Sequence, residues 1–394
     1  MTTTTQPMDT DSRGAWATAR GVMRDYPIIP LLFILTLLIA ALEILQPGIV
    51  IREDGLLGLN DRWISNTVKF AVPLAILAGA QTMTMITGGI DLSVGVVATM
   101  VSFVMATQVA SGVDPVFAIP LALGCAALAG LASGIGVALF RVHPLIMTLA
   151  VGLVVEGLLL VYQRQMLGVS AQIPEVITWL GTGRSFGLIP NSLLVFIPVA
   201  LFIGFTLKRT GFGRNLYAVG DNEGAARLAG VRVWQVLIVL YVLSAVLAGI
   251  GGLVYVGLIK ATTLSLAVPL MLPSVAAAVI GGTSIFGGRG GYAGTIVGAL
   301  ILQVLASMLT VLRIEEGTRR IIYGLIILGV TALYVRIPQE RQGEGDGRDP
   351  PLHRARSRGH QPHVAGGGTV RPRWRAYARP RPGAHRYGWR GRRH

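Results

Sequence analysis

Ten apolar segments, each close to the length that crosses a membrane, constrain the fold more than any other feature of this sequence. A spanning helix needs roughly 20 apolar residues. Charged residues make up only 13% of the 394 residues, against about 25% in a typical soluble domain. A charge at the bilayer centre is costly, so this deficit suits a surface that meets lipid. The predicted spans are 28–46, 67–87, 92–110, 116–140, 145–163, 188–207, 234–257, 268–286, 292–312 and 320–336.

The spans divide the chain into three predicted regions of an all-α integral membrane protein. Residues 1–27 are a polar N-terminal segment, 28–337 the membrane domain, and 338–394 a tail. The run 28–45 has no small-residue cleavage site behind it, so we read it as the first span and not as a signal peptide. Basic residues are slightly more frequent in the segments that lie inside if the N-terminus is cytoplasmic, and loop 208–233 carries five of them. An even span count then places both termini in the cytoplasm.

The tail differs from the rest of the chain in composition. Residues 341–394 contain 14 arginines, no lysine and three acidic residues. So few aliphatic side chains cannot form a core, which predicts a disordered segment. The abrupt change favours out-of-frame translation of GC-rich DNA, while a native tail attracted to anionic lipid is an alternative. No RNA-binding motif accompanies the arginines, so no nucleic-acid partner is predicted.

The segment 87–95, Thr-Gly-Gly-Ile-Asp-Leu-Ser-Val-Gly, separates the second and third spans. Its glycines, Gly88, Gly89 and Gly95, allow the backbone to leave the helical conformation. A carboxylate between apolar spans is costly unless it reaches a membrane face or a partner. Asp91 or Ser93 could also cap the next helix. Two interpretations stay open, a simple cap at a tight turn or a functional helix break.

A second glycine-rich segment, 280–291, begins with Ile-Gly-Gly-Thr-Ser. The phosphate-binding pattern G-x-x-x-x-G-K-[ST] is absent from it and from the whole chain, so no ATP site is predicted. Like the first segment, it ends one apolar span at a pair of glycines, here Gly281 and Gly282, shortly before another span begins. Paired breaks of this kind indicate an internal repeat with a substrate path between its halves.

Loop 208–233 is the longest polar stretch between two spans. Residues 222–229 are good helix formers, with Asp221 and Asn222 able to cap a helix and Gly230 able to end it. Such a surface helix could dock into a groove of a partner, although an ordinary solvated loop is equally compatible with the pattern.

Isolated polar residues inside the spans include Glu156, whose burial would be the most costly. We expect Glu156 to line a polar path or to pair with another group inside the bundle. His, Cys and carboxylate residues do not occur at metal-binding spacing, and no nucleophile motif is present. The one cysteine, Cys125, is read as packing. We therefore predict no metal site and no enzyme.

Together the segments 87–95, 211–231 and 280–291 resemble the ribose/xylose/galactose-type permeases of ABC importers, over about residues 66–337. The resemblance implies a bacterial inner-membrane subunit that forms the path for a pentose or hexose. It implies a second permease subunit, two cytoplasmic ATPase subunits that use ATP and Mg²⁺, and a periplasmic or lipid-anchored sugar-binding protein. It implies no cofactor bound by this chain itself. Branched-chain amino acids or nucleosides as substrates, or a standalone secondary transporter, are the alternatives.

The resemblance also assigns roles to residues. A short helix near 215–230 would couple the chain to the ATPase, and the two glycine-rich segments with Glu156 would form the translocation path or its helix breaks. The predicted coupling residues are Asn215, Gly220, Asn222, Glu223, Ala225, Ala226 and Gly230. The predicted path or break residues are Gly88, Gly89, Asp91, Ser93, Gly95, Glu156, Gly281 and Gly282.

Overall fold

The structure, a computed structural model, describes residues 28–52, 58–166, 170–185 and 189–315, and most residues from 317 to 329. The chain divides into two units, Met1–Pro338 and Gln339–His394, and all described residues belong to the first. The predictions for 1–27, for the tail 338–394 and for much of the span 320–336 fall outside the described residues.

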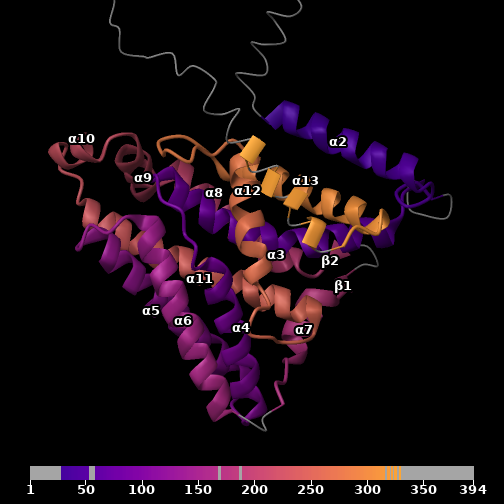
Figure 1. The fold of residues 1–394 in the computed structure, drawn as a ribbon, viewed down its shortest axis with the longest axis horizontal. Coiled ribbons are helices and arrows are strands. Elements are labelled where there is room, and N and C mark those ends of the chain that lie inside the picture. Colours follow the sequence, from indigo (N-terminus) through magenta and orange to yellow (C-terminus); the bar gives the residue numbers. More distant parts are fainter. Residues whose placement is uncertain are drawn as a thin grey trace, which may run out of the picture. The chain divides into compact units, whose positions relative to one another are not determined.

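The regular structure of the described residues is helical except for one isolated β-bridge, between Ile51 and Leu59, and one hairpin of two-residue strands, β1 (Arg184–Ser185) and β2 (Ile189–Pro190) (Figure 1). The all-α prediction therefore holds apart from this bridge and this hairpin. The helices are α2 (Ile28–Leu45), α3 (Asp61–Ile86), α4 (Val94–Ala110), α5 (Pro115–Ala138), α6 (Pro144–Gln165), α7 (Glu175–Thr182), α8 (Leu193–Arg209), α9 (Gly211–Asp221), α10 (Glu223–Leu228), α11 (Val233–Ile259), η2 (Val268–Leu270), α12 (Met271–Ile280) and α13 (Tyr292–Val311).

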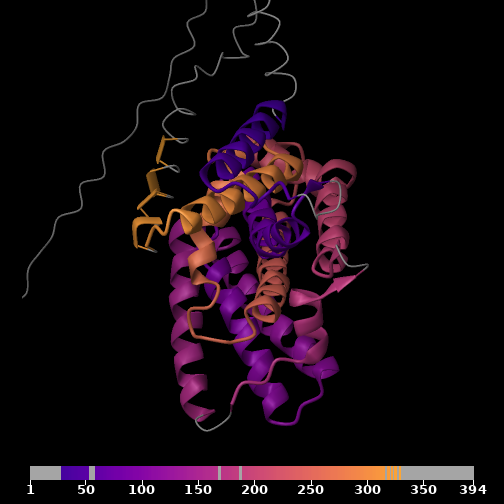
Figure 2. The ribbon, with the colours of Figure 1, turned by 90° about the vertical axis from the view of Figure 1, so that its right-hand side faces the viewer.

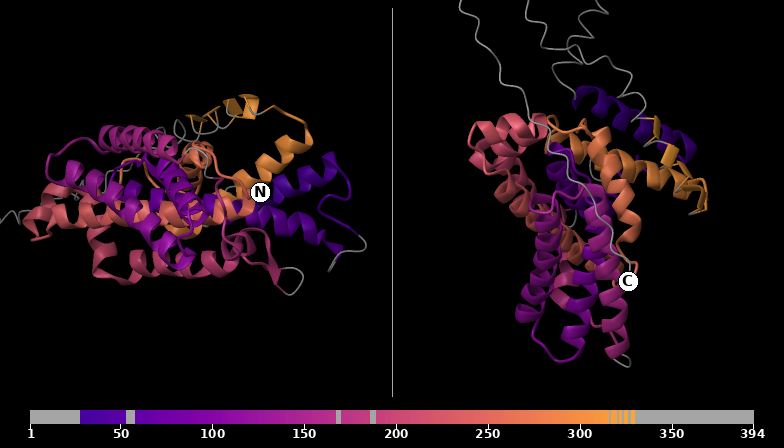
Figure 3. Two further views of the ribbon diagram at one scale, coloured as in Figure 1. Left: turned by 90° about the horizontal axis from the view of Figure 1, so that it is seen from below. Right: turned by 60° about the vertical axis from the view of Figure 1, so that its left-hand side comes forward.

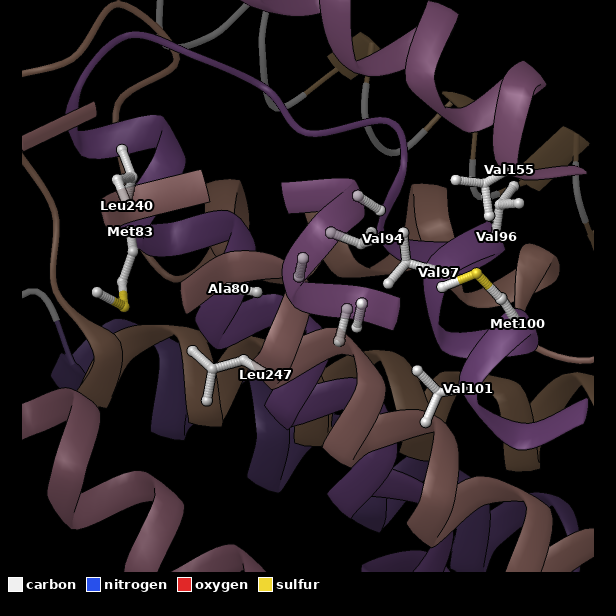
Figure 4. Packing of buried hydrophobic residues seen from close by; sticks show 14 of the residues in the cluster. Ala80, Met83, Val94, Val96, Val97, Met100, Val101, Val155, Leu240 and Leu247 are labelled. Atoms are coloured by element: carbon white, nitrogen blue, oxygen red, sulfur yellow. The ribbon is translucent and has the colours of Figure 1, made fainter. Parts of the chain in front are cut away.

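Helix α3 is the centre of the helix packing. It contacts α8, α11, α12 and α13, and 94% of its most apolar stretch is buried (Figure 2). Buried side chains of α3, α4 and α11, among them Met83, Val97 and Leu247, belong to one apolar cluster (Figure 4). Because α3 is enclosed by other helices, its polar side chains Gln81, Thr82 and Thr84 avoid lipid. This explains why its sequence is less apolar than that of the outer helices.

Six helices are long and apolar enough to cross a membrane, or seven if the bent pair α8 and α9 counts as one span. The described residues thus support a multi-pass membrane protein but not all ten predicted spans. Two predicted spans form shorter apolar helices, α4 with 17 residues and the stretch 268–280. The predicted span 268–286 is wrong in extent because α12 ends at Gly281, and Gly282 has a φ of +87°, a conformation that favours glycine.

Two helices in the region 208–233 replace the single short one that the sequence predicts. Helix α10 confirms the predicted helix, and Asn222 caps it by accepting a hydrogen bond from the Ala225 N–H at 3.0 Å. Helix α9 is not predicted. It begins at Thr210, whose hydroxyl accepts from the Gly213 N–H, and it buries Gly213, Leu216 and Val219 along one face. The three glycines of α9 are poor helix formers, so the sequence does not reveal the helical spacing of its buried residues.

Candidate functional site

The two glycine-rich segments and the end of α9 meet at one place, which we call the glycine junction: residues Ile86–Gly89, Val219–Asp221 and Phe286–Gly290. The Gly288 N–H donates to the Ile86 carbonyl at 2.9 Å. A Cβ on Gly220 would lie 1.8 Å from the Ile86 oxygen, and a Cβ on Gly287 would lie 2.8 Å from the Gly220 oxygen. Three backbones therefore touch directly, which leaves no room for side chains between them.

The helices α3 and α12 end in the same way at the two breaks. Gly88 and Gly282 have φ values of +79° and +87°. The N–H that follows each glycine bonds to the carbonyl five residues earlier, Gly89 to Thr84 and Thr283 to Ala278. This is the glycine-terminated cap that satisfies the last carbonyls of a helix. Helices α4 and α10 end with the same cap, at Gly112 and Gly230, so the shared ending leaves the predicted internal repeat untested.

Asp91 follows the first break and is only 1% exposed. One carboxylate oxygen accepts from the Ser93 N–H at 3.0 Å and from the Ser93 hydroxyl at 2.6 Å. The other accepts from the hydroxyl of Ser244 on α11 at 2.8 Å. The carboxylate thus accepts hydrogen bonds from Ser93, which directly precedes α4, and from Ser244 on α11. Asp91 therefore links two helices and is more than a local helix cap. Three donors offset the cost of burying the group.

The backbone around Asp91 is also held by side chains of two other helices. The Gln81 amide of α3 donates to the Asp91 carbonyl at 2.6 Å and accepts from the Asp91 N–H at 3.2 Å. The Thr148 hydroxyl of α6 accepts from the Leu92 N–H at 3.0 Å and donates to the Ile90 carbonyl at 3.2 Å. The turn therefore ties together α3, α4, α6 and α11.

The remaining break residues lie at contacts between helices. Gly95 of α4 faces the start of α12, where its Cβ would lie 3.1 Å from Met271 Cβ. Gly281 packs against α13, with its Cβ position 2.4 Å from the Thr295 nitrogen. Neither glycine belongs to the glycine junction. Both let neighbouring helices approach closely, as small residues do in membrane proteins.

Helix α10 projects from the same end of the fold as α9 (Figure 3). Its side chains are exposed apart from Ala226, which is buried, so of the two predicted docking alanines only Ala225 faces outward. Glu223 pairs with Arg227 one turn later on the same helix. Leu228 is 92% exposed. Gly230 ends the helix with a φ of +86°, as predicted.

One hollow lies beside α10 and a second lies beyond its C-terminal end. A hollow of about 540 Å³ lies toward the α5–α6 turn and is lined by Arg141, His143, Glu223 and Arg227 among others. A smaller one of about 340 Å³ is lined by Asn215, Gly230 and Arg232 among others. The short helix is therefore a ridge with an exposed apolar side chain and basic surroundings, a shape that fits a cleft in another protein.

Glu156 lies apart from these elements, in the middle of α6. Its side chain is exposed and makes no hydrogen bond or ion pair with any described residue. A carboxylate facing hydrocarbon at the helix centre would cost on the order of 3 kcal/mol. Lipid is thus an unfavourable environment for this face of α6.

Comparison with known proteins supplies the context for these features. Residues 63–331 match the family described as "Branched-chain amino acid transport system / permease component". The ribose import permease protein of Bacillus subtilis (strain 168) is 33% identical over 273 residues, 67% of this chain and 82% of the relative. The fructose import permease protein of Rhizobium meliloti is 31% identical over 267 residues, 66% of this chain and 74% of the relative. No solved structure matches the chain.

Proposed function

The chain belongs to the family of branched-chain amino acid transport system permease components, and we propose that it is the membrane-spanning permease subunit of an ATP-driven sugar importer. The substrate is a monosaccharide, a pentose or a hexose. The similarity to ribose and fructose import permeases carries this choice. The family description favours one alternative, a branched-chain amino acid.

The proposed assembly contains two permease subunits, identical or different, in the bacterial inner membrane. Two cytoplasmic ATPase subunits hydrolyse ATP with Mg²⁺, and a periplasmic or lipid-anchored binding protein delivers the sugar. The permease itself hydrolyses no ATP. ATP binding shifts the permease between outward-open and inward-open states because the ATPase binds those states with different affinity.

The end of the fold that carries α9, α10 and the glycine junction would face the cytoplasm. The exposed α10, with one hollow beside it and another beyond its C-terminal end, supports docking of the ATPase there. The contacts of Gly220 with Ile86 and Gly288 connect the docking region directly to the end of α3 and to the loop that follows α12. We also propose that both termini lie in the cytoplasm and that the chain crosses the membrane ten times. In this proposal the two helix breaks are counterparts in an internal repeat.

Substitution of Leu228 by aspartate is expected to weaken ATPase docking at least tenfold, because the new charge would lose its hydration when the helix is buried in the partner. Because Leu228 is almost fully exposed, the change leaves the permease's own packing intact. Copurification of the tagged permease with its ATPase, with gel filtration of the permease alone, measures both effects. Leu228→Met is the matched control and should bind normally. Normal copurification of the aspartate variant would show that α10 is not part of the docking surface.

The substrate class is tested by ATPase activity of the purified complex. The permease is coexpressed with the ATPase and binding protein encoded beside it, and the binding protein is loaded with each member of a sugar panel, with leucine, or with a nucleoside. Stimulation by one sugar-loaded form supports the proposal and identifies the sugar. Stimulation by leucine or a nucleoside alone would contradict the sugar assignment while leaving the permease role in place.

A further inference from the structure

Up to its last turn, helix α6 presents a face that is apolar except for one carboxylate. Its buried stripe includes Thr148, Val151, Val155 and Leu159. The opposite side exposes a series of leucines with Glu156 among them, at helical spacing: Leu149, Leu153, Glu156 and Leu160.

Glu156 cannot reach the membrane surface from its position. It stands nine residues before Gln165, the nearer end of α6, which corresponds to about 13 Å along the helix axis. A glutamate side chain is much shorter than that distance, so it cannot extend to the headgroups as lysine and arginine do near helix ends. If this face met lipid, the carboxylate would be held in hydrocarbon.

The exposed faces of α5 and α8 lack a central carboxylate. The outward side chains of α5 include Phe117, Leu121 and Leu128, and those of α8 include Leu201 and Phe205. Neither of these described helices carries an acidic or basic residue except in the last turn of α8. They have the composition of lipid-facing surfaces. Glu156 therefore distinguishes the α6 face from its apolar neighbours.

Gly157 follows Glu156, and a Cβ there would meet no described atom within 4 Å. Because Gly157 has no side chain, there is open space beside the Glu156 carboxylate, which is a hydrogen-bond acceptor. A carboxylate accepts hydrogen bonds on two oxygens, and such bonds are stronger than those between neutral groups. The hydroxyl groups of a neutral sugar are suitable donors.

We infer that the exposed face of α6 lines the water-filled translocation path, with the Glu156 carboxylate accepting hydrogen bonds from the hydroxyl groups of the passing sugar. This inference rests on the proposed transport function. It explains how a carboxylate is tolerated in the centre of a span, because water or sugar replaces the solvation that lipid would remove.

Cysteine accessibility tests the inference independently of activity. Cys125, the single native cysteine, is first changed to serine. Glu156→Cys and, as a matched lipid-facing control, Leu201→Cys on α8 are introduced separately into this background. A charged, membrane-impermeant thiol reagent reacts with a thiolate, which forms in water and not in hydrocarbon. We expect rapid labelling at position 156, slowed by sugar-loaded binding protein with ATP, and at least tenfold slower labelling at position 201. Equal, slow labelling at both positions would overturn the inference.

Two further variants separate this inference from the proposed function. Glu156→Leu should reduce sugar uptake at least tenfold although the variant still copurifies with its ATPase subunits. Glu156→Gln should retain part of the uptake because its amide oxygen still accepts a hydrogen bond. Full uptake by the leucine variant, beside a wild-type complex that responds to sugar, would refute the role of Glu156 alone. A wild-type complex that responds to no sugar would instead refute the sugar assignment.

Discussion

Replacement of Asp91 by alanine should lower the stability of the permease by on the order of 3–5 kcal/mol. The change leaves the donors on Ser93 and Ser244 without their acceptor in a site that is almost fully buried, and each unsatisfied buried donor costs about 1–3 kcal/mol. It also removes the bond between the turn and α11. Thermal unfolding in detergent, followed by tryptophan fluorescence, should show a midpoint lowered by at least about 5 °C.

Asp91→Asn is the control that separates hydrogen bonding from charge. Its oxygen can accept from Ser93, and its amide can donate to the Ser244 hydroxyl, so the asparagine variant should lose less than half as much stability as the alanine variant. Ser244→Ala should produce an intermediate loss because only one of the three bonds disappears. An alanine variant with wild-type stability would show that the turn is held without the carboxylate.

Gly220→Ala should have a comparable effect at the glycine junction. The added Cβ would stand 1.8 Å from the Ile86 oxygen and 2.8 Å from the Gly288 nitrogen. Both are backbone atoms that cannot rotate away, so α9 must move away from the end of α3. Overpacking of this kind costs about 1–3 kcal/mol and sometimes more. We expect a lower yield of folded permease, and in the protein that does fold, ATPase activity that no longer responds to the binding protein.

Gly204→Ala on α8 is the matched control for that substitution. It makes the same chemical change within a helix, but a Cβ at Gly204 would meet no described atom within 4 Å. Since alanine is the better helix former by up to about 1 kcal/mol, the control should be neutral or slightly stabilising. Equal behaviour of the two variants would mean that α9 does not pack against α3 as closely as the structure indicates.

Local rules were enough to predict several of the helix ends. Glycine in the left-handed region ends α3, α10 and α12 where the sequence pattern places a break, at Gly88, Gly230 and Gly282. The cap at Asn222 follows from the same kind of short-range pattern. These features depend on residues within a few positions of one another, which is why they could be read from the sequence.

Long-range pairing could not be read in this way. The bond from Ser244 to Asp91 joins residues 153 positions apart. The contact of α9 with the end of α3 and with the loop after α12 depends on how three separate segments pack. From the sequence, Glu156 could either line a polar path or pair with another group inside the helix bundle. Packing of α6 through its other face turns this side chain outward, so it finds no partner among the described residues.

Uptake of a radiolabelled sugar into proteoliposomes tests the central claim most directly. The vesicles contain the permease and its ATPase, ATP is supplied on the side of the ATPase, and the sugar-loaded binding protein is supplied on the opposite side. The proposal predicts accumulation of the sugar above its outside concentration, with a requirement for ATP, the ATPase and the binding protein together. Accumulation by the permease alone, without ATPase or ATP, would contradict it and identify a standalone transporter.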